Sequence, residues 1–234
     1  MSKDYAAIIG LNPSKGARSP KLWNCAFSKL NQKTEMICID IENEQDVPKV
    51  LKNLQEDEDF IGGCIAFPYK ETIFKTLDIE MIDETSRPIG AVNCLYRSDE
   101  KLLRGTNTDG YAALTSFINL TKKSNYIPKS ILIAGLGGAG KAVASFFSSH
   151  FISQGVKLIC SSRKENSDYC ESINCEWIPW QEIESQLNGI EAFVNCTTIG
   201  TGELINKSPI EISKNSNLKY VYDIVYDPSK TKIL

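Results

Sequence analysis

The 234-residue sequence is poor in histidine and lacks paired metal-binding cysteines. Its single histidine, His150, lies near the end of a predicted helix, so histidine is not expected to act as a general acid or base. The eight cysteines are scattered and include no Cys-x-x-Cys pair, which argues against a zinc site. The simplest interpretation is buried thiols in a reducing cytoplasm, with no bound metal.

Long apolar runs and a strong charge of one sign are also missing. The longest apolar runs are strand-length, far short of a membrane span, and residues 1–4 precede no signal-peptide core. The net charge is −3 and basic residues are not clustered, so neither nucleic acid nor a membrane surface is expected as a partner. Hydrophobic residues make up 42% of the chain, enough for an ordinary globular core. We expect a cytoplasmic protein.

Short apolar runs alternate with helical patterns along nearly the whole chain. This alternation predicts an α/β fold with largely parallel sheets, divided near Thr106 into domains of residues 1–106 and 107–234. Helices are predicted over residues 19–30, around 47–54, from near 70, from around 109 and over 141–147. In the second of these, Val47, Val50, Leu51 and Leu54 fall at helical spacing on one face. Strands are predicted at residues 5–9, 36–39, 61–66, 91–96, 101–104, 130–134, 156–161, 191–195 and 219–224.

A glycine-rich turn joins the strand at residues 130–134 to the next helix. Gly135, Gly137 and Gly140 form a Gly-x-Gly-x-x-Gly pattern. Gly135 allows a tight turn, Gly137 lets the backbone approach a pyrophosphate, and Gly140 permits close packing of helix and strand. The helix N-terminus then offers free N–H groups to the anion. A strand, this turn and a helix in this order favour dinucleotide binding over an ordinary glycine-rich turn.

The end of the following strand carries two cations, Arg163 and Lys164. An NAD site usually has an acidic residue here that binds the ribose 2′-hydroxyl. An Arg-Lys pair could instead bind a 2′-phosphate, whereas two solvated surface cations are the alternative. The position at the end of the second strand of this series favours NADP as the cofactor.

The chain resembles shikimate dehydrogenases along almost its whole length. The motifs that match in order and approximate spacing are Ser19-Pro20, Phe67 to Glu71, Gly90 to Asn93, Gly105 to Gly110, Gly135 to Gly140, Ser162-Arg163, Asn195 to Gly200 and Asp223 to Pro228. The resemblance implies an N-terminal α/β substrate domain and a C-terminal Rossmann-type NADP-binding domain, with a cleft between them. It also implies reduction of 3-dehydroshikimate to shikimate with NADPH, in the pathway to aromatic amino acids, with quinate as the substrate of some relatives. A homodimer is one assembly that the chain could form.

The resemblance assigns roles to individual residues. Lys70 matches the family's catalytic lysine and Asp109 its partner aspartate, and Ser19, Asn93 and Tyr226 match substrate-binding residues. The residues matched to cofactor binding are Gly135, Gly137, Gly138, Ala139, Gly140, Ser162, Arg163, Lys164, Asn195, Thr197 and Gly200. Independently of the family, hydride transfer to a ketone leaves an alkoxide that needs a proton, and an ammonium group can donate it.

Each substrate-side residue also has an ordinary interpretation. Ser19 could cap its helix, Thr108 or Asp109 could cap the helix that starts around residue 109, and Lys70 could be a solvated loop lysine. Asn93 could satisfy a turn, and Tyr226 could be a packed aromatic residue with a hydrated hydroxyl. Taken one at a time these interpretations are the better ones, but the joint order of the motifs favours the functional interpretation.

The sequence departs from the family pattern on the substrate side. Ala17 replaces a serine that would bind the substrate carboxylate, Cys64 and Ala66 replace Asn and Thr, and Trp23 replaces a histidine. Each missing partner for a buried polar group costs about 1–3 kcal/mol. Family members also continue for a few tens of residues beyond the position of Leu234. These departures motivate an alternative function, a non-catalytic protein that binds NADP or a metabolite as a sensor or assembly subunit.

Overall fold

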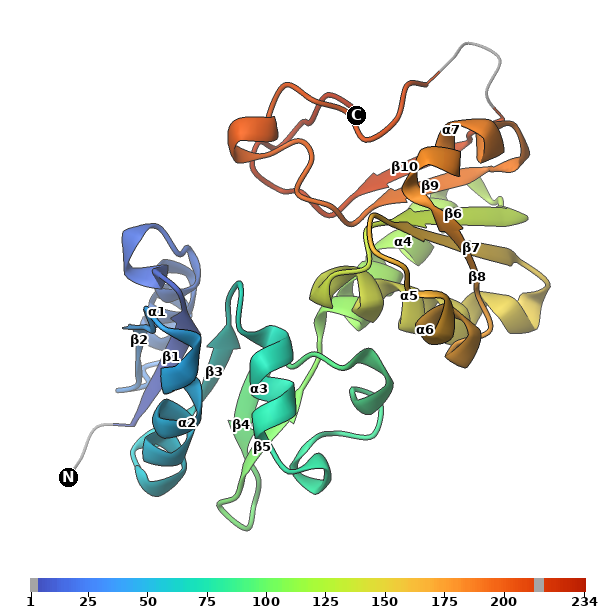
Figure 1. The fold of residues 1–234 in the computed structure, drawn as a ribbon. Coiled ribbons are helices and arrows are strands. Elements are labelled where there is room, and N and C mark those ends of the chain that lie inside the picture. The colour runs from blue at the N-terminus through green and yellow to red at the C-terminus, as the bar shows by residue number, and fades with distance from the viewer. Residues whose placement is uncertain (1–3, 213–216) are drawn as a thin grey trace. The chain divides into compact units, whose positions relative to one another are not determined.

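The computed structural model describes residues 4–212 and 217–234, and the chain forms two compact units, Met1–Thr108 and Asp109–Leu234 (Figure 1). Residues 1–3, on which part of the signal-peptide prediction rests, lie outside the described ranges. Within those ranges, no helix combines the length and the hydrophobicity that a membrane span requires.

The first unit is built on a mixed five-stranded sheet with the order β2-β1-β3-β4-β5. The first three strands pair in parallel, and β4 and β5 form an antiparallel hairpin beside β3. The strands are β1 (Tyr5–Gly10), β2 (Glu35–Asp40), β3 (Phe60–Ile65), β4 (Cys94–Arg97) and β5 (Leu103–Thr106). Four 3₁₀ turns lie in the connections, namely η1 (Pro13–Lys15), η2 (Glu44–Asp46), η3 (Ile79–Met81) and η4 (Arg87–Ile89).

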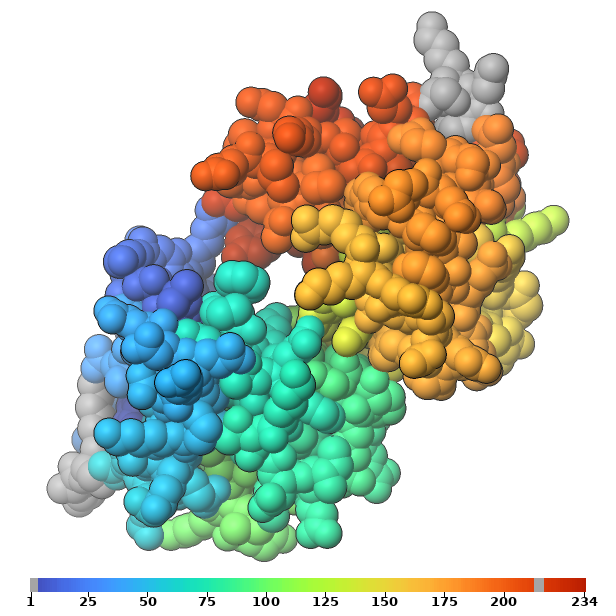
Figure 2. All heavy atoms as spheres, viewed as in Figure 1, coloured from blue at the N-terminus to red at the C-terminus, as the bar shows by residue number. Residues whose placement is uncertain are grey.

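Three helices cover this sheet, namely α1 (Ser19–Lys29), α2 (Val47–Glu56) and α3 (Lys70–Thr76). Val47, Leu51 and Leu54 lie on one face of α2, as their spacing predicts, and pack with Ile73 of α3 in the main core of the unit. Val50, predicted on the same face, is half-buried and packs against this core. The opposite side of α2 is polar and exposed (light-blue spheres in Figure 2). Phe27 of α1 belongs to a separate, smaller cluster on the sheet.

The second unit is a parallel five-stranded sheet with the order β10-β9-β6-β7-β8. The strands are β6 (Ser130–Ala134), β7 (Lys157–Ser162), β8 (Glu176–Pro179), β9 (Ala192–Asn195) and β10 (Tyr220–Asp223). From the central β6 the chain proceeds outward to β7 and β8, and then returns to form β9 and β10 on the other side. Ligands of such sheets bind at the carboxyl ends of the strands where the order reverses, which here lies between β6 and β9.

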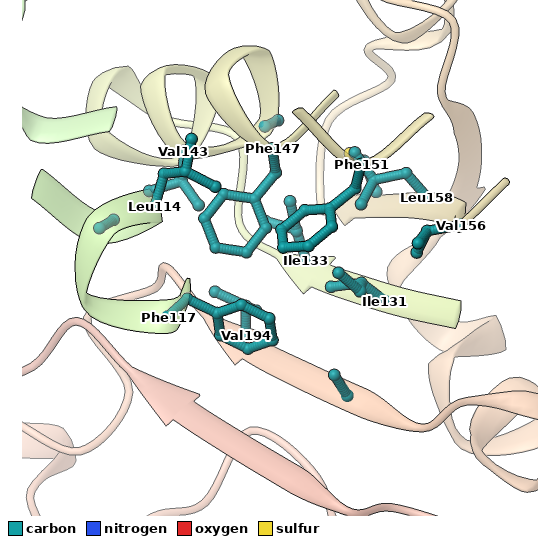
Figure 3. Close-up of a cluster of buried hydrophobic side chains, with 14 of the residues drawn as sticks. Leu114, Phe117, Ile131, Ile133, Val143, Phe147, Phe151, Val156, Leu158 and Val194 are labelled. Atoms are coloured by element: carbon teal, nitrogen blue, oxygen red, sulfur yellow. The ribbon is translucent and has the colours of Figure 1, made fainter. Parts of the chain in front are cut away.

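Both faces of this sheet are covered. Helices α4 (Asp109–Ser124) and α5 (Gly138–Phe151) pack on one face, where Phe117 lies against Phe147 and Phe151 with ring centroids 5.1 and 5.8 Å apart (Figure 3). Residues of α7 (Ile183–Gln186) and the turn after it cover the other face. The remaining short elements are η5 (Ile152–Gln154), α6 (Ser167–Ser172), η6 (Trp180–Glu182), η7 (Leu187–Gly189) and η8 (Gly202–Leu204).

The main differences from the sequence predictions concern short elements. Residues 91–93 were predicted as the start of a strand, but β4 begins only at Cys94. The N–H of Val92 donates to Lys70 O instead of to a neighbouring strand, and pairing with β3 and β5 starts only at the backbone of Asn93. The next strand begins at Leu103, two residues later than predicted. The sequence did not predict β8 or α6, which have four and six residues. The other predicted strands and helices are present, with boundaries shifted by a few residues.

Candidate active site and cofactor site

The first unit brings Lys70 and Asn93 to the same edge of its sheet. Lys70 is the first residue of α3, which begins shortly after β3 ends. Its carbonyl accepts the Val92 N–H at 2.9 Å, and the Asn93 carbonyl accepts the Ile65 N–H at 2.8 Å. Lys70 is half-buried, so it is not the fully solvated loop lysine of the ordinary interpretation.

Asn93 is buried, and its side chain is tied to the turn that follows β5. Its Oδ1 accepts the Thr108 N–H at 2.9 Å, and its Nδ2 donates to Thr108 Oγ1 at 3.0 Å. Asn107 and Ser86, to which the sequence analysis gave no role, hold this turn in place. The Asn107 N–H donates to Ser86 Oγ at 2.7 Å, and Asn107 Nδ2 donates to the Ala91 carbonyl at 2.9 Å. The carboxamide therefore has a fixed orientation.

The remaining substrate-side candidates occupy different settings. Ser19 is half-buried at the first position of α1, and Arg18 takes the N-cap position, so the interpretation of Ser19 as an N-cap is wrong. The reason is that Arg18 is already helical and its carbonyl accepts the Leu22 N–H at 3.2 Å. Asp109 is half-buried at the first position of α4. Tyr226 is 73% exposed, so the interpretation as a packed aromatic residue is wrong.

The residues that depart from the family pattern lie in the same unit as Lys70. Cys64, near the end of β3, and Ala66, just after it, are half-buried, as is Ala17 before α1. A Cβ added at Gly10 would lie 2.8 Å from the Ala66 Cβ, so the end of β1 passes close to this position. Trp23 is 45% exposed on α1.

In the second unit, the glycine turn closes tightly at the carboxyl end of β6. Gly135 has a φ of +98°, a conformation that L side chains rarely adopt. A Cβ at Gly140 would lie 1.9 Å from Gly135 O, so only glycine fits there. A Cβ at Gly137, which occupies the N-cap position of α5, would meet no protein atom within 4 Å. Gly138 and Ala139 then begin the helix, and an anion could approach this N-terminus over the open Gly137.

The segment after β9 lies against this turn. A Cβ at Gly135 would lie 2.9 Å from Thr197 Cγ2, which places Thr197 beside the glycines. Asn195 is fully buried. Its Oδ1 accepts the Thr197 N–H at 3.0 Å and the Thr197 hydroxyl at 2.7 Å, while its Nδ2 donates to the Ile199 carbonyl at 3.0 Å. Gly200 closes the segment with a φ of +108°. The buried Asn195 side chain thus holds the backbone of residues 197–199 in one conformation.

Asp223, at the end of β10, supports this segment and was quoted in a motif without a predicted role. Its Oδ1 accepts from Asn195 Nδ2 at 3.0 Å and from the Val225 N–H at 2.9 Å, and its Oδ2 accepts the Thr231 hydroxyl at 2.6 Å. Burial, and then the Asp223 carboxylate, raise the pKa of the Cys196 thiol. Cys196 therefore stays protonated at neutral pH and is a poor nucleophile.

Arg163 and Lys164 follow β7 directly, and both are exposed. The Ser162 side chain is buried, and its hydroxyl donates to the Lys164 carbonyl at 2.6 Å, so it acts on the loop backbone. Among residues 4–212 and 217–234, no group of His, Cys, Asp and Glu side chains is arranged to hold a metal ion.

Comparison with known proteins shows similarity to shikimate dehydrogenases. A family model described as the shikimate dehydrogenase substrate binding domain matches residues 8–95. The shikimate dehydrogenase (NADP(+)) of Bacillus mycoides is 30% identical over 241 residues, which cover 99% of this chain and 82% of that protein. The chain belongs to the shikimate dehydrogenase family. The family expected from the motifs is therefore confirmed, and the names of its relatives favour an NADP-dependent enzyme over the non-catalytic alternative.

Solved structures of shikimate dehydrogenases have the same fold. Shikimate 5-dehydrogenase from Listeria monocytogenes, in complex with shikimate and NAD, has a TM-score of 0.78 at 25% identity, over 99% of this chain and 82% of that one. The enzyme from Thermus thermophilus, in complex with NADP(H) and shikimate, has a TM-score of 0.75 at 24% identity, over 96% and 80%. The expected α/β fold with a Rossmann-type parallel sheet is confirmed.

Proposed function

We propose that this chain is an NADP-dependent oxidoreductase of the shikimate dehydrogenase type. It would transfer hydride reversibly between NADPH and 3-dehydroshikimate or a related cyclic hydroxy acid, in the pathway to aromatic amino acids. The observation that carries the proposal is the glycine turn at Gly135–Gly140, which packs against Thr197 where the strand order reverses. The names of the family relatives support the choice of cofactor and substrate.

The two units would divide the work. Residues 1–106 would bind the substrate and supply the catalytic lysine, and residues 107–234 would bind the cofactor. The division of the structure after Thr108 and the family match at residues 8–95 support this assignment.

Lys70 would act as the general acid, with Asp109 as its partner aspartate. When NADPH is bound it supplies the hydride, and the substrate oxygen then needs a proton. The half-buried Lys70 ammonium would donate this proton and stabilise the developing negative charge. The fixed Asn93 carboxamide would orient substrate hydroxyls, and Ser19 and Tyr226 would bind near the substrate carboxylate.

The cofactor site would combine three segments. The turn containing Gly135, Gly137, Gly138, Ala139 and Gly140 would bind the pyrophosphate. The exposed cations Arg163 and Lys164, held by Ser162, would bind the 2′-phosphate. The segment containing Asn195, Thr197 and Gly200 would line the nicotinamide side.

The chain would work in the cytoplasm, since all eight cysteines are thiols. A homodimer is the assembly that we propose to test, by light scattering of the purified protein. No nucleic acid or membrane partner is proposed.

The decisive experiment measures turnover at about 340 nm with shikimate and quinate, using both NADP and NAD, for Lys70→Ala and for the wild type. Lys70→Ala should lower kcat by about 10²–10⁴-fold, because the proton donor is lost, and should leave NADPH affinity nearly unchanged. Lys75→Ala is the matched control, since Lys75 is an exposed lysine on the same helix. Unchanged turnover in Lys70→Ala would exclude the catalytic role of this lysine. Tight NADPH binding by a wild type that oxidises no such acid would instead favour the non-catalytic alternative.

A further inference from the structure

The loop that carries Arg163 and Lys164 is organised around one hydroxyl group. Ser162 Oγ donates its hydrogen to the Lys164 carbonyl at 2.6 Å and accepts hydrogen bonds from Asn166 Nδ2 at 3.1 Å and from Trp177 Nε1 at 3.0 Å. Asn166 Nδ2 also donates to the Lys164 carbonyl at 3.0 Å. The backbone of residues 162–166 is therefore held by the hydrogen bonds of three side chains, those of Ser162 and Asn166 at its two ends and that of Trp177 in β8.

Trp177 reaches this loop from the neighbouring strand. In the parallel pairing of β7 with β8, Trp177 lies opposite Cys160. Cys160 and Ser162 are two residues apart on β7, so their side chains are on the same face of the sheet as the indole. The Trp177 ring is half-buried and packs against the core shown in Figure 3. Its N–H is thus a donor with a fixed position at the end of β7.

This donor determines how the serine hydroxyl is oriented. An indole N–H can only donate, whereas a serine hydroxyl has one hydrogen to donate and two lone pairs. While Trp177 and Asn166 occupy the acceptor side of Ser162 Oγ, its hydrogen is directed to the Lys164 carbonyl. The loop backbone is held in one conformation, while the Arg163 and Lys164 side chains remain exposed.

We infer that Trp177 is a positioning residue for recognition of the 2′-phosphate, because it preorganises the Arg163–Lys164 loop through Ser162. The inference rests on the proposed function, in which these two cations bind NADP. A loop already in its binding conformation loses less conformational entropy when it binds the phosphate. Trp177 therefore contributes to the preference for NADP over NAD without contacting the cofactor.

The experiment compares adenosine 2′,5′-bisphosphate with 5′-AMP by isothermal titration calorimetry of the full chain. The two ligands differ only in the 2′-phosphate, and neither requires catalysis. Trp177→Phe keeps an aromatic ring in the core but removes the N–H. It should weaken binding of the bisphosphate by about 3–10-fold, the range for one hydrogen bond, and leave 5′-AMP affinity unchanged. Trp180→Phe is the matched control, since Trp180 is a half-buried tryptophan that packs on the other face of the sheet.

A double-mutant cycle tests whether Trp177 acts through the serine. Ser162→Ala should lower the preference for the bisphosphate at least as much as Trp177→Phe, and the double variant should be no worse than Ser162→Ala. Thermal unfolding of each variant, measured without ligand, separates this effect from a loss of folding.

Each outcome has a distinct meaning. A wild type that binds both ligands equally would overturn the proposed NADP site, and this inference with it. A wild-type preference that persists in Trp177→Phe would overturn the inference alone. Equal weakening of both ligands in Trp177→Phe would also overturn it, because the indole would then support the nucleotide site in general.

Discussion

Two alanine substitutions in the glycine turn should separate its role in folding from its role in NADPH binding. At Gly140 an added Cβ would lie 1.9 Å from Gly135 O and 2.8 Å from Gly135 C, and both are backbone atoms that cannot move without opening the turn. Overpacking of this kind costs about 1–3 kcal/mol and occasionally more. Because backbone is involved, we expect Gly140→Ala to lower the free energy of unfolding by about 3 kcal/mol.

Gly137→Ala should behave differently. Gly137 has a φ of −78° and a ψ of −174°, which alanine also adopts, and its Cβ would meet no protein atom within 4 Å. Alanine lowers the conformational entropy of the unfolded chain, which raises the free energy of unfolding by about 0.4–1 kcal/mol. This gain is offset because alanine is a poorer N-cap residue than glycine. The free energy of unfolding should therefore change by less than about 0.5 kcal/mol. The new methyl group would, however, occupy the approach to the helix N-terminus and should weaken NADPH binding at least about tenfold, or about 1.4 kcal/mol.

Urea unfolding followed by circular dichroism measures the free energy of unfolding, and titration of NADPH fluorescence measures the NADPH affinity. The reasoning predicts a stable Gly137→Ala that binds poorly and an unstable Gly140→Ala. Wild-type NADPH affinity in Gly137→Ala would refute the placement of the pyrophosphate over this residue. Wild-type stability in Gly140→Ala would refute the tight closure of the turn.

Three further predictions concern stability. Asn195→Ala should lower the free energy of unfolding by about 3 kcal/mol, since several half-buried partners lose their hydrogen bonds to this buried side chain, whereas Thr198→Ala, at an exposed position in the same segment, should change it little in the same urea experiment. Ser161 Oγ is buried without a hydrogen-bond partner among the described residues, so Ser161→Ala should leave the melting temperature unchanged or raise it; a clear drop would contradict this. Burial and the hydrogen bond to Asp57 raise the pKa of Tyr5 to about 12. The unfolded chain loses this proton first, near about pH 10, so the contribution of Tyr5 is complete below that pH and is lost as the pH rises toward about 12. The stability difference between wild type and Tyr5→Phe should shrink over that interval.

The sequence could predict the features that depend on residues close together in the chain. The strand at residues 130–134, the glycine turn and the following helix are adjacent, and their order alone specifies a dinucleotide-binding turn. The helical spacing of Val47, Leu51 and Leu54 likewise showed which face of α2 is buried. A periodic apolar pattern indicates the buried face because residues on one face of a helix or strand recur at a fixed interval in the sequence.

The edge strand β8 was beyond this reasoning, although the equally short edge strands β5 and β10 were predicted. β8 (Glu176–Pro179) has an apolar run of only two residues, Trp177 and Ile178, and it ends in a proline, so no local pattern marks it as a strand. Its strand conformation follows from pairing with β7 at the edge of the sheet, and a pairing partner cannot be seen in a local pattern.

The amino-acid sequence by itself determined the family, most of the elements and the candidate site residues, because motifs and periodicity are local in the chain. Only the tertiary structure decided which side chains hold those residues in place. Trp177 donates to Ser162 from 15 residues away, and Asp223 accepts from Asn195 across 28 residues. These partners meet because parallel strands bring distant segments to one edge of a sheet, and hydrogen-bond geometry over such separations leaves no periodic signal in the chain.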